Sequence, residues 1–217
     1  MSRPEPLVLA FDTSAAHCAA ALLSEDRVLA SRAEAMSTGQ AERLLPLLEE
    51  ILREGGVTWR DLSALGVGTG PGNFTGVRIG VALARGLALG LKVPAIGVTV
   101  FEALAWGRDA ALVARDARLG QVHLQAFGPA AFAPLTQGMD ASLPSLPPGT
   151  PVIGDFAETL AARCGGVASP PLVPLAEGVA RLAASRLGQD NPRPAPLYLR
   201  APDAAPPRDP APSILPG

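Results

Sequence analysis

Short apolar runs and longer segments with helical periodicity alternate through the first hundred residues. Three apolar runs follow one another across tight polar turns, which predicts an antiparallel meander of three strands. Apolar residues then recur every three or four positions in later segments, and this spacing predicts amphipathic helices. In chain order, the pattern predicts strands at 7–12, 18–23 and 28–32, a helix at 39–54, a strand at 64–67, a helix at 74–91, a strand at 94–98 and a helix at 101–106.

The second half repeats this opening in a weaker form. An apolar run again ends in an acid, Asp116, and a second run follows after a charged turn. From position 201 onward six of seventeen residues are Pro, a composition that cannot bury a core and therefore predicts a mobile tail. The elements expected in this half are strands at 111–116, 121–127 and 152–154, a Pro-rich loop at 134–151, and helices at 156–164 and 175–187.

The order of these elements predicts the fold class. Three strands followed by alternating helices and strands (β-β-β-α-β-α-β-α) are typical of a half-domain in the superfamily of actin, sugar kinases and Hsp70 ATPases, whose sheet is ribonuclease-H-like. We therefore expect an α/β protein with two actin-like lobes, each built on a mixed sheet, the second lobe being reduced. The predicted division is a first lobe over 1–105, a second lobe over 106–200 and the tail over 201–217.

Composition narrows the functions that this chain can have. Of its 217 residues 48% are apolar and 18% are charged, and the formal net charge is −2, so nothing attracts the whole chain to phosphate backbones or anionic lipid. Two histidines and two cysteines are too few for a recognisable zinc site. Two cysteines also form no disulfide framework, which favours a cytoplasmic location. No uninterrupted apolar run reaches the roughly 18 residues that span a bilayer, so we expect no membrane contact and no metal.

The sequence contains no recognisable set of catalytic residues. No Lys follows a Gly-rich turn, which excludes a Walker phosphate loop. His17 and Cys18 are neighbours on an expected strand, where their side chains point to opposite faces and cannot form a nucleophile–base pair. His123 lies in another expected strand and is interpreted as a packing or surface residue.

Two stretches are candidates for phosphate contact. Asp12-Thr13-Ser14 follows the first strand, where this superfamily has its first phosphate-binding turn, and hydroxyl and N–H groups there can meet phosphate oxygens. The other interpretation is a local turn that caps a hairpin. The stretch 68–76 (GTGPGNFTG) does not fit the dinucleotide pattern GxGxxG; it either presents N–H groups at a helix start or is a structural strand-to-helix turn. The candidate phosphate-turn residues are Asp12, Thr13, Ser14, Gly70, Gly72 and Thr75.

The expected helix over 74–91 carries small residues in two stripes. The first stripe is Gly76, Gly80, Ala84 and Ala88, and the second is Ala82, Gly86 and Gly90. Each Gly costs a helix about 1 kcal/mol relative to Ala, so close approach of another element should offset the cost. The helix over 39–54 has an apolar arc wider than packing on one sheet requires.

Two interpretations follow from these helices, burial inside the domain and a helical interface between subunits, and we expect the interface. The residues predicted to form it are Leu45, Leu48, Leu52, Phe74, Gly76, Val77, Arg78, Gly80, Val81, Ala84, Arg85 and Ala88.

Several motifs together resemble one protein family. They are LAFDTS, AERLLPLLEEIL, VGTGPGNFTGVRIG with its continuation to VPAIGVTVFEALA, DARLGQVHLQAF and the late PLYLR. They resemble the TsaB family, also called YeaZ, of bacterial tRNA threonylcarbamoyladenosine biosynthesis proteins, over nearly the whole chain up to about Arg200. The resemblance implies a cytoplasmic, non-catalytic subunit that binds and supports the catalytic protein TsaD, with the ATPase TsaE joining the assembly.

The resemblance also implies how the chain meets its partners. The family pairs through the two helices of the first lobe, so the chain alone would cover this surface as a homodimer. It would reach tRNA through the complex and bind no cofactor by itself, with an ATP or ADP site left open at the junction with the partner. TsaD-type relatives hold a metal with His-x-x-x-His; the counterparts here are Val100 and Leu104, which cannot ligate one.

Two other functions stay open from the residues alone. An active ATP-dependent kinase or ATPase of the same fold needs an acid at the phosphate turn of each lobe, and Asp12 and Asp116 are available, although no Gly-rich adenosine loop is evident. A glycoprotease-like peptidase needs a metal or nucleophile site, and the sequence offers none that can be recognised. We expect the scaffold rather than either enzyme.

Overall fold

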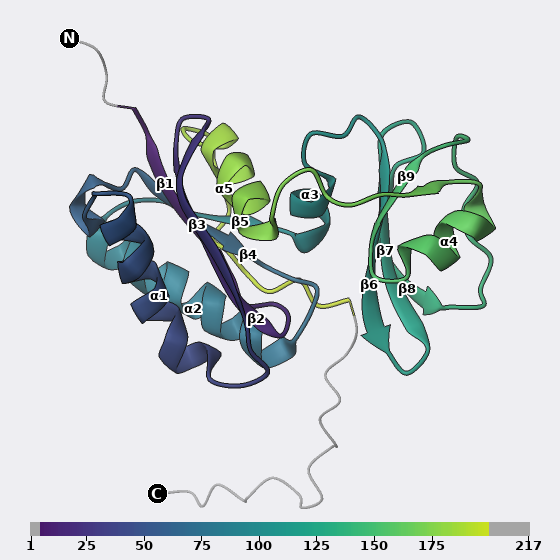
Figure 1. The fold of residues 1–217 in the computed structure, drawn as a ribbon, viewed down its shortest axis with the longest axis horizontal. Helices are drawn as coiled ribbons and strands as arrows, with labels where there is room; N and C mark the ends of the chain where they lie inside the picture. The colour runs from purple at the N-terminus through teal and green to yellow at the C-terminus, as the bar shows by residue number, and fades with distance from the viewer. Residues whose placement is uncertain (1–4, 200–217) are drawn as a thin grey trace, which may run out of the picture.

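The structure, a computed structural model, describes residues 5–199 and contains two five-stranded sheets that lie side by side (Figure 1). Helices pack against both sheets, and the short helix α3 (Val100–Ala105) lies between them. The tail predicted over 201–217 lies outside the described residues.

The first sheet has the strand order β3-β2-β1-β4-β5. Its first three strands form the predicted antiparallel meander, and β1 also pairs in parallel with β4, which pairs in parallel with β5. This arrangement agrees with the ribonuclease-H-like sheet expected from the order of elements. The strands are β1 (Leu7–Asp12), β2 (His17–Ser24), β3 (Arg27–Ala35), β4 (Ala64–Gly68) and β5 (Ala95–Val98).

Helices cover both faces of the first sheet. On one face lie α1 (Gln40–Glu54) and α2 (Phe74–Leu91), and on the other lies α5 (Leu175–Ser185). A short 3₁₀ turn at Trp59–Asp61 lies in the connection from α1 to β4. The alternation along β2 explains this division, because successive side chains of a strand point to opposite faces. Leu22 packs in the core with α1 and α2, whereas Leu23 packs in the core with α5.

The second sheet has the order β10-β9-β6-β7-β8. Two of its strands were not predicted: β8 occupies the start of the expected loop at 134–151, and β10 has two residues. Pro134 argued against a strand, but Pro is tolerated on an edge strand such as β8. The elements are β6 (Ala111–Arg118), β7 (Gln121–Phe127), β8 (Phe132–Gly138), β9 (Pro151–Gly154), α4 (Ala157–Cys164) and β10 (Val167–Ala168).

An apolar cluster joins α3 to the second sheet. Val100, Phe101 and Leu104 of α3 pack with Val113 of β6 and Ile153 of β9. Val100 and Leu104, which the resemblance matches to metal-binding histidines, are buried packing residues.

Helix α5 follows the second sheet in the chain but packs against the first. It contacts β1, β2 and β4 as well as α3. The approach is close because α5 has small residues on this side: a Cβ at Gly178 would lie 2.4 Å from the Ala103 carbonyl oxygen. The range 106–200 therefore contains all strands of the second sheet and, against our expectation, one helix of the first. The lobe boundary itself stays a prediction.

Candidate functional site

The first residues of the turn after β1 are buried, and Asp12 is hydrogen-bonded there through Oδ1, while its buried Oδ2 has no hydrogen-bond partner among the described residues. Asp12, Thr13 and Ser14 are each at most 1% exposed. Oδ1 of Asp12 accepts hydrogen bonds from the Ser14 N–H (2.9 Å) and the Ser14 hydroxyl (2.8 Å). His17 Nε2 lies 2.7 Å from the same oxygen. Because a carboxylate only accepts, the His17 ring donates through Nε2. These bonds have the form of the local turn that we had kept as the alternative to a phosphate site, with an added histidine.

The Gly-rich loop between β4 and α2 lies directly against this turn. The Asn73 N–H donates to the Ser14 carbonyl oxygen, and the Thr13 hydroxyl donates to the Gly76 carbonyl oxygen at 2.7 Å. A Cβ at Gly72 or at Gly76 would lie 2.0 Å from the Ser14 or the Thr13 carbonyl oxygen, respectively. These glycines therefore let the loop backbone approach the chain's own turn, which is filled by protein.

The remaining candidate phosphate-turn residues lie around this contact. Gly70 has φ +88°, and a Cβ there would lie 3.2 Å from Val77 Cγ2 of α2. Thr75 is exposed on the first turn of α2, whose N-cap is Asn73, with Asn73 Oδ1 accepting from the Gly76 N–H at 2.9 Å. The fold thus brings Asp12, Ser14 and Gly72 together and leaves Thr75 outside the contact. Whether any of these six residues meets phosphate stays a prediction.

The corresponding acid of the second sheet, Asp116, is exposed near the end of β6. Asp116 Oδ1 accepts from the Arg118 N–H, and the Asp116 N–H donates to Asp155 Oδ2, each at 2.8 Å. Asp155 also lies 3.4 Å from Arg115 Nε. Within residues 5–199, no three or more His, Cys, Asp or Glu side chains are placed to hold a metal ion.

The sequence did not reveal the pairing of His17 with Asp12. We had considered His17 only beside Cys18, and the two side chains do point apart, with His17 toward Asp12 and Cys18 into the core. The pairing depends on the chain reversal at residues 13–16, which brings positions 12 and 17 together. The sequence signal that could have indicated this pairing is the spacing of Asp12 and His17, five positions apart on either side of a turn.

Cys18 is predicted to be chemically inert. It is fully buried, and burial raises the pKa of its thiol to about 11, with a further increase from Glu34 that Arg43 opposes. At pH 8 about one thiol in a thousand would be ionised, and the thiolate is the reactive form. Iodoacetamide should therefore modify Cys164 and leave Cys18 unmodified in the native chain, as measured by peptide mass spectrometry, whereas urea should make both reactive. Modification of both at equal rates without urea would contradict this.

The two small-residue stripes of α2 face different surroundings. Gly76, Gly80 and Ala84 of the first stripe are buried against the chain itself; a Cβ at Gly80 would lie 2.8 Å from Thr13 Oγ1. In the second stripe, a Cβ at Gly86 or at Gly90 would meet no atom of the described chain within 4 Å. The second stripe is therefore the open one.

This placement corrects part of the predicted interface. Seven of its residues are buried in the folded chain, because they lie on the sides of α1 and α2 that face the first sheet. They cannot touch a partner while the fold is intact. Leu45 and Phe74 are 40% and 36% exposed, Arg78 and Arg85 are exposed, and Ala88 is half-buried. The buried residues are Leu48, Leu52, Gly76, Val77, Gly80, Val81 and Ala84.

We call the exposed side of α2 the open α2 face: Ala82, Arg85, Gly86, Leu89 and Gly90. Leu89 at its centre is 76% exposed. Over its 18 residues α2 has a mean hydropathy of 1.4, so by length and composition alone it could cross a membrane, yet only 28% of it is buried. Arg78 and Arg85 interrupt this apolar run, and the expected absence of membrane contact stays a prediction. A helix this apolar and this uncovered fits a protein interface.

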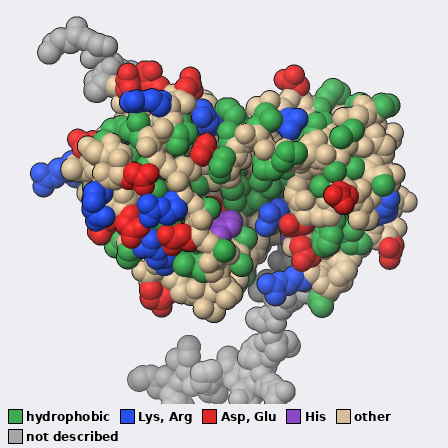
Figure 2. Space-filling view, in the orientation of Figure 1, with side chains coloured by type: hydrophobic (Ala, Val, Ile, Leu, Met, Phe, Trp, Pro, Cys, Tyr) green, Lys and Arg blue, Asp and Glu red, His purple; other side chains and the backbone are tan. Residues whose placement is uncertain are grey.

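Beside α2, charged side chains hold α1 to the edge of the sheet. Arg43 of α1 binds Glu34 of β3 and Glu50, and Arg32 of β3 binds Glu50 and Glu54. Figure 2 shows acidic and basic side chains gathered on this lobe. The hydrogen bond from Arg43 lowers the pKa of Glu50 to about 2. Since these pairs are partly exposed, they contribute little stability and mark a solvated surface.

Comparison with known proteins gives a consistent group of relatives. The family model described as "TsaD: tRNA N6-adenosine threonylcarbamoyltransferase" matches residues 31–129. A "tRNA threonylcarbamoyladenosine biosynthesis protein TsaB" of Escherichia coli (strain K12) is 41% identical over 122 residues, 54% of this chain and 52% of that protein. The TsaB of Bacillus subtilis (strain 168) is 40% identical over 120 residues, with the same coverage. The aligned part of the chain spans about half the length of these curated relatives.

Longer matches extend over almost the whole chain. An uncharacterised protein of Mycobacterium tuberculosis is 33% identical over 213 residues, 92% of this chain and 94% of that protein. The solved structure "YeaZ from Pseudomonas aeruginosa" is 29% identical, with a TM-score of 0.75 over 89% of this chain and 100% of that one. The protein EutJ of Carboxydothermus hydrogenoformans, at 12% identity and a TM-score of 0.50, shares the fold alone. The fold is the predicted actin-like, ribonuclease-H-like α/β fold.

Proposed function

The chain belongs to the TsaB/YeaZ family, and we propose that it acts in the biosynthesis of threonylcarbamoyladenosine in tRNA as a non-catalytic subunit that docks on a TsaD-type catalytic protein. The observation that carries this proposal is the open α2 face. An 18-residue apolar helix of which 28% is buried leaves apolar surface in water, which association would remove.

The charges of this surface favour a specific partner over loose association. Arg78 and Arg85 lie on the exposed side of α2, with Arg85 one helical turn before Leu89, and arginine is enriched in protein interfaces. The small side chains of Ala82, Gly86 and Gly90 would let a partner helix approach closely. Without a partner, the chain would cover the same face with a second copy of itself. We place the chain in the cytoplasm.

The closed turn after β1 supports the absence of independent catalysis. The carbonyl oxygens of Thr13 and Ser14 face the Gly-rich loop, and the Ser14 N–H is bonded to Asp12. This leaves these groups unsuited to hold the phosphates of a nucleotide, since anions require free N–H donors. Any ATP or ADP would then bind at the junction with the TsaD-type protein. A TsaE-type ATPase and tRNA would join through the assembled complex.

Two measurements test this function. Deletion of the gene, with the TsaD-type protein still present, should remove threonylcarbamoyladenosine from tRNA hydrolysates, and reintroduction of the gene should restore it, as measured by mass spectrometry. The purified chain alone should hydrolyse ATP no faster than a buffer blank. Unchanged nucleoside levels in the deletion strain, or ATP turnover by the isolated chain near the 1 s⁻¹ or more that is typical of enzymes, would overturn the proposal.

A further inference from the structure

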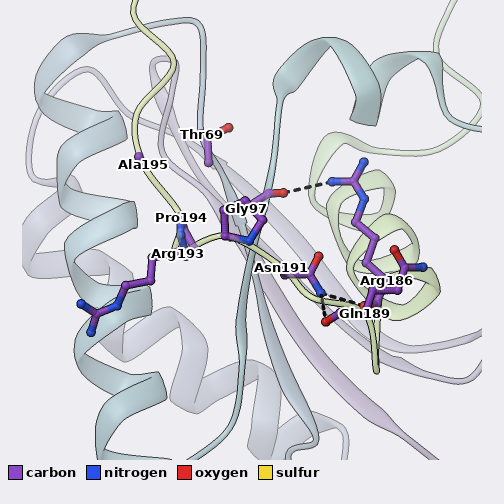
Figure 3. A pocket seen from close by; sticks show the side chains of 9 residues that line it. Thr69, Gly97, Arg186, Gln189, Asn191, Arg193, Pro194 and Ala195 are labelled. Atoms are coloured by element: carbon purple, nitrogen blue, oxygen red, sulfur yellow. Dashed lines mark hydrogen bonds between the residues drawn. The ribbon is translucent and has the colours of Figure 1, made fainter.

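The segment after α5, residues 186–199, runs from the edge of the first sheet to the second sheet. Its beginning is anchored firmly. Arg186 Nη1 donates to the Gly97 carbonyl oxygen of β5 at 3.0 Å, and Arg186 Nη2 binds Glu102 of α3. Asn191 Nδ2 donates to the Arg186 carbonyl oxygen at 2.8 Å. Figure 3 shows Arg186, Asn191 and Gly97 around the cavity that the segment borders.

The middle of this segment borders two hollows that are open to the surface. Cavities of about 440 and 370 Å³ border it, and both are lined by Gln189, Asn191, Arg193 and Pro194. Pro192, Pro194 and Pro196 have no N–H to donate, so the segment cannot join β5 as a further strand. Pro194 instead packs over Gly97, where a Cβ would lie 3.4 Å from the Pro194 Cα. The middle is therefore a spacer that leads to the next contact.

The end of the segment makes contacts in both directions. The Leu197 N–H donates to the Thr69 carbonyl oxygen of the Gly-rich loop at 2.8 Å. Leu197 and Leu199 pack in the apolar cluster that joins α3 to the second sheet. The Thr136 hydroxyl of β8 donates to the Leu199 carbonyl oxygen at 3.3 Å. Both leucines thus pack where α3 meets the second sheet.

Tyr198 points the opposite way, toward the start of α2. Its ring lies 5.0 Å from the Phe74 ring, centroid to centroid, and its hydroxyl accepts from Arg78 Nε at 2.6 Å. The Arg78 guanidinium lies 3.7 Å from the centre of the Phe74 ring, a cation–π distance. Side chains alternate along an extended chain, so three consecutive residues reach α2, the Gly-rich loop and the second sheet at once.

We propose that Leu197, Tyr198 and Leu199 form a clasp that fixes the angle between the two sheets and ties this angle to the start of α2. The apolar contacts of both leucines hold the sheets together, and Tyr198 joins that contact to Phe74 and Arg78. Arg78 lies one helical turn before Ala82 of the open α2 face. If the proposed function holds, a protein docked on α2 would also act on the clasp; the clasp itself requires no partner.

Spin labels on the isolated chain test the clasp. Glu49→Cys on α1 and Glu158→Cys on α4 provide exposed attachment points, in a Cys164→Ala background with Cys18 buried. Double electron–electron resonance should give one narrow distance peak. Tyr198→Ala and Leu199→Ala should each widen that peak at least twofold, whereas Tyr198→Phe, which keeps the ring contacts with Phe74 and Arg78, should leave it narrow. Arg193→Ala, an exposed residue of the spacer, is the matched control and should also leave it narrow.

Amide hydrogen exchange gives a second measure. Because the clasp holds the Leu197 N–H against Thr69, that amide should exchange at least tenfold faster in Tyr198→Ala than in Arg193→Ala. Tyr198 is 45% exposed, so its substitution should leave the circular dichroism unchanged; if Leu199→Ala unfolds the chain, Tyr198→Ala decides alone. A distance peak of wild-type width in Tyr198→Ala, or an equal widening in Arg193→Ala, would overturn the proposal.

Discussion

Replacing Leu89 with Asp is expected to weaken binding to the TsaD-type protein of the same organism by about 30-fold or more. This is the loss of roughly 2 kcal/mol that defines an interface hot spot, at tenfold for each 1.4 kcal/mol. Leu89 lies at the centre of the open α2 face and is 76% exposed. A carboxylate there would lose its water on docking, and Arg85, exposed one helical turn before it, would offset only part of that cost.

The structure offers a matched control in the second sheet. Leu119, in the hairpin between β6 and β7, is 83% exposed. Leu119→Asp makes the same chemical change at a similarly exposed position but should leave the affinity within twofold of the wild type. Calorimetric titration measures both variants, and their thermal unfolding shows that neither change affects the fold. Equal weakening by both substitutions, or wild-type affinity of Leu89→Asp, would mean that α2 is not the docking face.

The sequence predicted helices and strands well where neighbouring residues alone determine the start and end of the element. Helix α2 begins and ends at the predicted residues. Its start is fixed by Asn73, whose side chain caps the helix, and it ends where Lys92 adopts a left-handed conformation with φ 59°. Strand β8 was missed because Pro134 usually breaks a strand, and only its position at the sheet edge allows it.

The candidate site was predicted less well, because its geometry depends on contacts between distant residues. Stripes of small residues on α2 correctly indicated close approach. The sequence could not tell which stripe meets the chain itself, since Gly76 and Gly80 face Thr13, more than sixty positions away. For the same reason, the sequence did not reveal that the Gly-rich loop packs against the turn after β1. The apolar residues of α1 and α2 predicted both helices, but they did not show which side of each helix is exposed to solvent.

The glycines of α2 allow the packing argument to be tested within one helix. Gly76→Ala should lower the free energy of unfolding by about 3 kcal/mol, at the upper end of the usual cost of overpacking, and reduce Tm by roughly 6–12 °C for a chain of this size. The reason is that the new Cβ would lie 2.0 Å from the Thr13 carbonyl oxygen, a backbone atom that cannot move away without shifting the buried turn.

Gly86→Ala is the matched substitution in the same helix and should have the opposite sign. Around its Cβ position the described residues leave at least 4 Å free, so the helix gains the higher propensity of Ala, about 0.5–1 kcal/mol of added stability. Urea unfolding monitored by circular dichroism measures both changes. A stability loss in Gly86→Ala as large as that in Gly76→Ala would show that both stripes of α2 are packed against the chain. The open α2 face would then not exist, and the surface on which docking depends would have to be sought on another element.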